Sequence, residues 1–189
     1  MNYKKLFFGV IICIAITSLA FTSVTTQDVI VKESSIKWKA YKVTGEHHGT
    51  ILLKSGVLKF ENEMLIGGDF IVDMTSLTVD DQKGMKKKFL TKHLKSDDFF
   101  DVKKHTTSSL TFTEVLIAEN SYAITADLTI KGITKPVSFY MSIVDNIATT
   151  KLKINRTHFN IKYRSTSFFD NLKNKAITDE FDLEVTLTF

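Results

Sequence analysis

The stretch "SYAITADLTIKGITKPVSFYMSIV", Ser121 to Val144, contains two runs in which apolar and polar residues alternate. The apolar positions of the two runs are Tyr122, Ile124, Ala126, Leu128 and Ile130, and then Val137, Phe139, Met141 and Ile143. Successive side chains of a β-strand point to opposite faces, so each run predicts a strand with one apolar side. Turn residues from Gly132 to Pro136 separate the runs and predict a connection between antiparallel strands.

The same alternation recurs on both sides of this stretch. Further strands are expected around residues 36–40, 51–60, 66–74, 110–112, 152–154 and 181–189. Within residues 51–60 the apolar positions change parity at Ser55–Gly56, which predicts a β-bulge that bends the strand. About eight antiparallel strands without crossover helices favour an all-β fold, either a closed barrel or a sandwich.

One segment departs from the two-residue period. In "DDQKGMKKKFLTKHLKSDDFF", Asp80 to Phe100, the residues Met85, Phe89 and His93 are spaced by four, as on one face of a helix. Asp80 or Asp81 could cap the first turn, where unpaired N–H groups attract a carboxylate. The sequence therefore predicts a helical insertion between the third and fourth strands.

The N-terminal residues have the pattern of a secretory signal peptide. Lys4 and Lys5 precede an apolar run from Leu6 to Ile16, and Ser18-Leu19-Ala20 follows as a small-x-small cleavage site. We expect cleavage after Ala20, export to the periplasm and a lead-in over residues 21–34; an uncleaved anchor is the alternative. The mature chain would lack cysteine, because Cys13 is the single one, so no disulfide would stabilise it.

Four segments together resemble the YceI-like lipid-binding family: "GTILLKSGVLKF", "HLKSDDFFDVKKHTTSSLTF", "ADLTIKGITKPVSF" and "INRTHFNIKYRSTSFFDNLKNKAITDEFDLEVTL". The resemblance covers residues 35–189 and departs at Thr106, where the family usually has a proline before the strand. It implies an eight-stranded antiparallel, lipocalin-like barrel in an exported protein. It also implies a polyisoprenoid, such as a quinone tail or prenyl chain, held inside the barrel.

The apolar faces of the strands and the helix supply the expected wall of such a cavity. A barrel of eight strands is just wide enough for side chains to fill or for one small ligand to enter. The candidate ligand-binding residues are Trp38, Phe60, Phe70, Met74, Phe89, Phe112, Leu128, Ile130, Phe139, Met141 and Phe159. The alternative is that these side chains only pack against one another, because a fold does not by itself establish a function.

The adjacent pair His47–His48 follows Glu46 in a segment flanked by glycines. Neighbouring residues of a strand point to opposite faces, so the two imidazoles should diverge, whereas a metal site needs three or four converging ligands. We therefore expect no metal. His47 or His48 contacting a ligand head group is the functional interpretation, and a structural turn is the alternative.

A basic helix and scattered carboxylates remain to be interpreted. Lysines of the helix could meet anionic lipid head groups or form a solvated face: Lys86, Lys87, Lys88, Lys92 and Lys95. Nucleic-acid binding is not expected, because no fold motif accompanies this cluster. No cofactor is expected, and no catalytic residue is identified, because a GxSxG serine is absent and Asp97, Asp98 and Asp101 suit a capped turn.

Three functions remain after these exclusions. The first is a non-enzymatic carrier that holds an isoprenoid-type lipid or quinone in an apolar barrel cavity. The second is a small outer-membrane barrel, because the terminal run from Phe181 to Phe189 alternates and ends on an aromatic residue. The third is a lipid-modifying enzyme, which would need a polar constellation inside the cavity.

Overall fold

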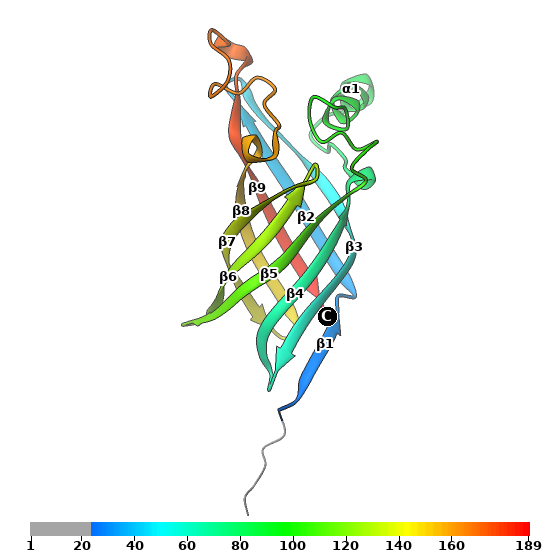
Figure 1. The fold of residues 1–189 in the computed structure, drawn as a ribbon. Coiled ribbons are helices and arrows are strands. Elements are labelled where there is room, and N and C mark those ends of the chain that lie inside the picture. Colours follow the sequence, from blue (N-terminus) through cyan, green and yellow to red (C-terminus); the bar gives the residue numbers. More distant parts are fainter. Residues whose placement is uncertain (1–23) are drawn as a thin grey trace, which may run out of the picture.

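The computed structural model describes residues 24–189, and in that part of the chain nine antiparallel strands form one sheet. Eight of them close into a barrel in the order β3-β2-β9-β8-β7-β6-β5-β4, with β4 pairing back onto β3 (Figure 1). The strands are β1 (Thr26–Ile30), β2 (Glu33–Lys42), β3 (Gly45–Glu61), β4 (Met64–Asp73), β5 (Thr107–Ala118), β6 (Ser121–Ile130), β7 (Ile133–Val144), β8 (Ile147–Asn155) and β9 (Ile177–Thr188). The expected signal peptide, residues 1–20, lies outside the described residues.

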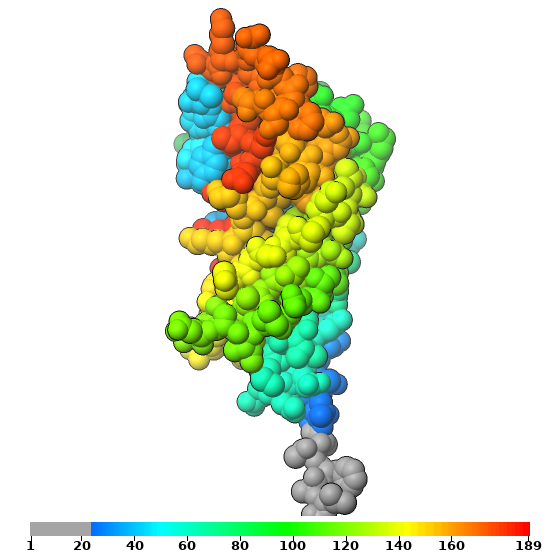
Figure 2. Space-filling view, turned by 60° about the vertical axis from the view of Figure 1, so that its left-hand side comes forward, coloured from blue at the N-terminus to red at the C-terminus, as the bar shows by residue number. Residues whose placement is uncertain are grey.

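The two ends of the barrel differ in what connects the strands. At the hairpin end, tight turns join β3 to β4, β5 to β6 and β7 to β8 (Figure 1). The helical end has the tight turns from β2 to β3 and from β6 to β7, and it also has longer connections. These contain the helix α1 (Gly84–Leu94), the 3-10 turns η1 (Met74–Ser76), η2 (Arg156–Phe159) and η3 (Lys173–Lys175), and the loop 156–176, in which the last two lie. The space-filling view shows the turn between β5 and β6 projecting from the wall (Figure 2).

The predicted bulge in β3 is confirmed. The pairing of β3 with β4 shifts register between Leu53 and Ser55, and the buried positions change parity from Ile51 to Leu58 across it. The bulge returns both halves of this 17-residue strand to the barrel interior. It lets one long strand pair with β2 over its first half and with β1 over its last residues.

The apolar faces of the strands point into the barrel and the polar faces point outward. In β8 the buried residues Leu152 and Ile154 alternate with the exposed Lys151 and Lys153. This orientation is the reverse of the lipid-facing pattern that the outer-membrane alternative requires. Separately, none of the helices within residues 24–189 has the length and hydropathy needed to cross a membrane.

The position of the helix corrects the prediction. Helix α1 follows β4 and precedes β5, so it does not lie between the third and fourth strands of the chain. The difference arises because β1, within the segment expected as a lead-in, is itself a strand that pairs with residues 57–61 of β3. The eight-stranded barrel itself is confirmed.

The predicted helix cap is wrong. The N-cap residue is Lys83, which makes no side-chain capping hydrogen bond. Asp81 instead accepts hydrogen bonds from His47 and from the backbone N–H of His48. The carboxylate therefore fixes the loop before α1 to the start of β3 rather than capping the helix.

Aromatic rings fill the hairpin half of the barrel. Phe60 packs against Phe189 with ring centroids 5.7 Å apart. Phe112 lies between Phe70 and Phe139, with centroid distances of 5.4 and 6.0 Å. Buried aliphatic side chains complete this half: Leu58, Leu65, Met141 and Leu187. Contacts of this kind among buried side chains provide much of the stability of the fold.

An apolar cavity at the helical end of the barrel

A cavity of about 130 Å³ occupies the helical half of the barrel. Residues from six strands, α1 and the connecting loops surround it: Ile36, Trp38, Ala40, Ile51, Val72, Met74, Leu77, Leu94, Phe99, Phe100, Ser108, Leu128, Ile130, Arg156, Ile161, Ile177, Thr178, Glu180, Phe181 and Leu183. The lining is predominantly aliphatic and aromatic. A void of this size among apolar side chains can hold an apolar group about as large as benzene.

Four of the nominated ligand-binding residues line this cavity: Trp38, Met74, Leu128 and Ile130. The others do not line it. Phe60, Phe70, Phe112, Phe139 and Met141 belong to the packed core nearer the hairpin end. Phe159 is fully buried in η2.

Phe89 lies on the outside of the molecule. Its side chain is 65% exposed, because Leu94, and not Phe89, is the buried residue of α1. The helical spacing predicted the element correctly and its inward face incorrectly. Leu90 and Leu94 form a second apolar pair on α1, displaced around the helix from Met85 and Phe89.

A close approach of three chain segments forms one wall of the cavity. The indole N–H of Trp38 donates to the carbonyl oxygen of Thr78 at 3.0 Å, across Gly49. A Cβ atom at Gly49 would lie 2.0 Å from that carbonyl oxygen and 2.9 Å from the Trp38 ring. Thr78 and Asp80 also pair with Thr50 and His48 through backbone hydrogen bonds. Glycine is thus required here by space, and the segment before α1 continues the barrel wall.

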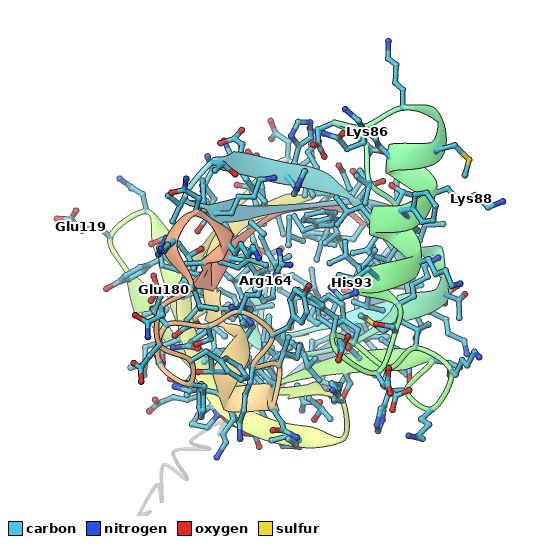
Figure 3. All side chains as sticks on the ribbon, turned by 90° about the horizontal axis from the view of Figure 1, so that it is seen from above. Lys86, Lys88, His93, Glu119, Arg164 and Glu180 are labelled. Carbon is cyan, nitrogen blue, oxygen red and sulfur yellow. The ribbon has the colours of Figure 1, made fainter. Side chains whose placement is uncertain are left out.

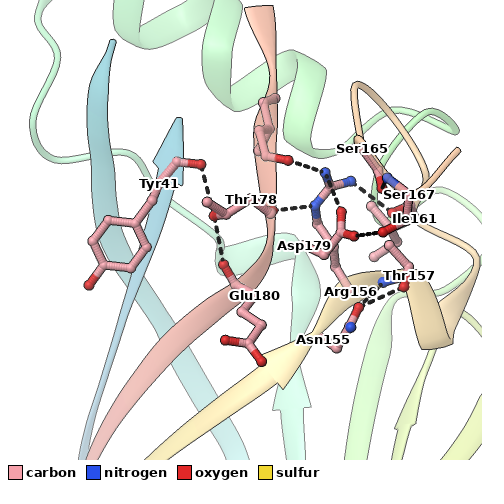
Figure 4. A network of polar contacts seen from close by, with 11 residues as sticks. Tyr41, Asn155, Arg156, Thr157, Ile161, Ser165, Ser167, Thr178, Asp179 and Glu180 are labelled. Atoms are coloured by element: carbon pink, nitrogen blue, oxygen red, sulfur yellow. Dashed lines mark hydrogen bonds and ion pairs between the residues drawn. The ribbon is translucent and has the colours of Figure 1, made fainter. Parts of the chain in front are cut away.

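Arg156 is the buried charged group of the site and is only 4% exposed. Its guanidinium donates to the carbonyl oxygens of Thr178, Ile161 and Ile177 at 2.9, 2.8 and 3.0 Å (Figure 4). Asp179 lies 3.5 Å from it as a counter-ion. Burial lowers the pKa of Arg156, and the Asp179 charge opposes that shift. The arginine therefore fixes the loop 156–176 to the start of β9.

His93, a residue of α1, lies at the mouth of the barrel and contacts the loop 156–176. Figure 3, seen from the helical end, shows His93 directed from α1 toward the barrel opening, with Arg164 on the opposite side. Its ring makes edge contacts with Phe99 at 5.1 Å and with Tyr163 at 4.5 Å. The Nε2 atom is buried and has no hydrogen-bond partner among residues 24–189. A buried polar atom without a partner is uncommon and calls for an explanation.

The histidine pair named by the sequence lies at the rim, outside the cavity lining. His47 Nδ1 is 2.7 Å from Asp81 Oδ2, whereas His48 is exposed beside Glu46 on the outer face. Burial raises the pKa of Asp81, but hydrogen bonds from Gln82, His47 and the His48 N–H outweigh it and lower that pKa to about 2. The two imidazoles diverge, as strand geometry predicts.

Few polar side chains gather near the cavity. Across residues 24–189, no group of three or more His, Cys, Asp or Glu side chains is placed to hold a metal ion. The polar residues of the cavity wall are Ser108, Arg156, Thr178 and Glu180. Of these, Arg156 is committed to backbone carbonyl groups, and Thr178 donates to the carbonyl oxygen of Tyr41 or Glu180.

Sequence reasoning missed several residues of the site. Ile36, Ala40, Phe181 and Leu183 occupy the apolar positions of recognised alternating strands, so their parity was a usable signal. Phe99 and Phe100 adjoin the helix, at the end of the segment that the sequence assigned to the helical insertion. Arg156 carried no signal in the sequence pattern, because its partners are brought close only by the closure of the barrel, whereas His93 was placed on the predicted helix but given no role.

Comparison with known proteins agrees with this architecture. The YceI-like domain model matches residues 27–189. A UPF0312 protein of Photorhabdus laumondii is 46% identical over 46 residues, and one of Pectobacterium atrosepticum is 42% identical over 53 residues. These alignments cover 24% and 28% of this chain and the same shares of the relatives, so the chain spans about a quarter of the length of the curated relatives it matches.

Three solved structures share the fold. BcnA of Burkholderia cenocepacia aligns with a TM-score of 0.66 at 20% identity, over 82% of this chain and 96% of its own. A polyisoprenoid binding domain from Saccharophagus degradans, implicated in plant cell wall breakdown, aligns at 0.56 and 10% identity, over 85% and 95%. The Campylobacter jejuni YCEI protein aligns at 0.51 and 18% identity, over 92% and 88%. With an eight-stranded barrel and a family match over residues 27–189, the chain belongs to the YceI-like domain family.

Proposed function

We propose that this protein is a non-enzymatic binding protein that holds the apolar tail of a lipid in the helical-half cavity. The observation that carries the proposal is the contrast inside one barrel: rings fill the hairpin half, whereas apolar side chains leave about 130 Å³ unfilled in the helical half. Membership of the YceI-like family supports a binding role. An unfilled void among apolar groups costs stability, so its presence favours a functional reason.

The ligand class that fits best is a slender, branched hydrocarbon of the polyisoprenoid type, including a quinone tail. One structural neighbour is described as a polyisoprenoid binding domain. Each buried CH₂ contributes about 0.8 kcal/mol, so one five-carbon unit supplies roughly 4 kcal/mol without any polar contact. The free volume suits a single such unit as it stands, and a longer tail requires side chains such as Met74 to change rotamer.

The polar head of the ligand would lie at the helical end, beside His93. The unpartnered Nε2 offers one hydrogen bond at the mouth, next to Phe99 and Leu94, which line the cavity. His93 replaces His47 and His48 as the candidate head-group contact, because those two lie outside the lining. A carbonyl or hydroxyl head would satisfy the orphaned atom.

The cellular location completes the proposal. The apolar N-terminal run with its small-x-small site supports export to the periplasm, where a lipid with a long hydrocarbon tail needs protection from water. N-terminal sequencing of the protein from its own cells tests this directly. Cleavage near Ala20 is expected, and an intact N-terminus would contradict export by this route.

Native mass spectrometry of the protein purified from its own cells, followed by organic extraction, tests the binding role. We expect an adduct of prenyl or quinone mass. Ala40→Phe places a ring in the cavity, and Lys39→Phe adds the same ring at the neighbouring, outward-facing position as a matched control. Loss of the adduct only in Ala40→Phe supports the site. An unliganded wild-type mass with no uptake of added quinone would overturn the proposal.

A further inference from the structure

The outer face of α1 presents two large apolar side chains to solvent. Met85 is 62% exposed and Phe89 is 65% exposed, one turn apart, on the side of the helix opposite the buried Leu94. Neither residue lines the cavity, so lipid binding inside the barrel does not account for them. Adjacent exposed apolar side chains on a helix often mark a surface that contacts a partner.

Lysines surround this apolar pair. From Gln82 to Ser96 the chain contains six lysines and no acidic residue. Lys87 pairs with Asp80 at 3.4 Å and Lys95 donates to the Thr75 carbonyl oxygen at 2.7 Å. The remaining four, Lys83, Lys86, Lys88 and Lys92, form no ion pair with a carboxylate of residues 24–189. Lys88 points away from the barrel in Figure 3.

Charge is distributed unequally between the two ends of the barrel. At the helical end, residues 73–106 contain eight lysines and six aspartates, and the loop 156–176 adds five basic residues against one acidic residue. The three hairpin turns at the opposite end carry Glu61, Glu63, Glu119 and Asp145 and no lysine. Exposed apolar residues also occur near the hairpin end, among them Leu116, Ile117 and Val144, but acidic turns accompany them. An anionic surface would therefore attract the helical end and repel the hairpin end.

We propose that the outer face of α1, formed by Met85 and Phe89 with Lys86, Lys88 and Lys92, docks reversibly on a bilayer that contains anionic phospholipid. Lysines are attracted to anionic head groups, and large apolar side chains beside them can enter the boundary between head groups and acyl chains. Docking on this face places the mouth beside His93 next to the membrane. The surface does not depend on what the cavity holds, so the proposal stands apart from the proposed function.

Site-specific fluorescence on the full chain separates this surface from the apolar N-terminal segment. In a Cys13→Ser background, an environment-sensitive label is attached at Met85→Cys on α1 or at Asn120→Cys on the hairpin turn. Vesicles of equal parts phosphatidylglycerol and phosphatidylcholine should shift the emission of the α1 label to the blue and leave the Asn120 label unchanged. Vesicles of phosphatidylcholine alone should shift neither label.

Vesicle co-sedimentation of matched variants measures how much the lysines and the apolar pair of α1 each contribute to membrane binding. Lys86→Gln/Lys88→Gln/Lys92→Gln should weaken partitioning roughly 100-fold, because each lysine near an anionic surface contributes about 1 kcal/mol. Met85→Ser/Phe89→Ser should weaken it about tenfold or more. The controls Lys37→Gln/Lys135→Gln/Lys151→Gln and Leu116→Ser/Ile117→Ser change equally exposed residues elsewhere and should leave it nearly unchanged.

Three results would overturn the proposal. The first is equal partitioning of the α1 variants and their controls. The second is a vesicle-dependent shift at Asn120 but not at Met85. The third is a shift of the α1 label that depends on protein concentration without vesicles, because a second copy of the chain would then cover the face. A failure of lipid extraction from the cavity would leave the vesicle result unaffected, so the two proposals fail separately.

Discussion

The hairpin half and the helical half of one barrel follow different physical rules. In the hairpin half, aromatic side chains of β4, β5 and β7 contact one another in the Phe70–Phe112–Phe139 cluster. In the helical half, polar ties such as the Arg156 guanidinium and the Trp38–Thr78 hydrogen bond hold the connecting segments around a void. Side-chain packing stabilises the hairpin half, whereas hydrogen bonds hold the backbone of the helical half around the cavity.

The contrast between the two halves indicates that different residues provide the stability of the fold and the space for a ligand. A barrel of this strand number can be filled by its own side chains, and aromatic rings occupy the interior of the hairpin half of this one. The open half must therefore be kept from collapsing by groups that hold the backbone rather than fill the interior. Four sets of substitutions test this division, in order of decreasing expected effect on stability.

The sharpest test truncates a leucine in each half. Leu58→Ala, in the packed half, should lower the free energy of unfolding by about 4 kcal/mol. Leu128→Ala, at the cavity wall, should cost about 2 kcal/mol, because that side chain already borders empty space and has fewer contacts to lose. Urea denaturation followed by circular dichroism measures both losses. Equal losses would remove the distinction between the halves.

Removing the buried arginine should break the helical half selectively. Arg156→Leu leaves three carbonyl oxygens without their donor and should cost about 3 kcal/mol. Arg156→Lys keeps the charge but cannot reach all three carbonyl groups, so it should restore only part of the loss. Amide hydrogen exchange should show lost protection confined to residues 156–180. Uniform loss of protection over the hairpin half as well would contradict a local role.

Gly49 offers a test of the close approach at the cavity wall. Gly49→Ala should cost about 2 kcal/mol, because its Cβ would meet the Thr78 carbonyl oxygen and force the segment before α1 away. Gly67→Ala is the matched control in the hairpin half, where the nearest atom to a new Cβ is Lys59 Cδ at 3.4 Å. That control should change thermal stability little. Equal stability of the two variants would show that the segment before α1 can move away from Gly49 without a loss of stability.

The smallest expected effect concerns Asp81 and depends on pH. Its pKa in the folded protein is about 2, below the ordinary value of 3.8. The ionised carboxylate therefore stabilises the fold at pH values above 3.8. Asp81→Asn should therefore lower the free energy of unfolding by about 1.5 kcal/mol at neutral pH. The difference from wild type should shrink as pH falls below about 4 and vanish only once the pH is below about 2, the pKa in the folded protein. A pH-independent difference would show that the charge is not responsible.

Much of the barrel was readable from the sequence because its strands have one buried face. Alternation predicted the strands from β2 to β9, and the parity change at Ser55–Gly56 predicted the bulge. The five-residue strand β1 escaped detection because it is too short to show a period and is mostly exposed. Missing it misplaced α1 in the strand count.

The site was less readable, for reasons visible in particular residues. Trp38, Met74, Leu128 and Ile130 were identified by strand parity, but parity cannot distinguish a filled half from an open one along the barrel axis. Helix α1 carries two apolar pairs, and only the folded structure shows that Leu94 faces inward and Phe89 outward. The ties from His47 to Asp81 and from Arg156 to Ile177 span 34 and 21 residues, beyond any local pattern.

The position of Trp38, with its hydrogen bond to Thr78, allows its fluorescence to report on the cavity. Trp38 is the single tryptophan of the chain, and its ring both lines the cavity and donates to the segment before α1. The intrinsic tryptophan fluorescence therefore comes from a ring in the cavity wall, without any background from other indoles. An arriving hydrocarbon would change the brightness of that signal, whereas detachment of the adjoining segment would admit water and move it to longer wavelength.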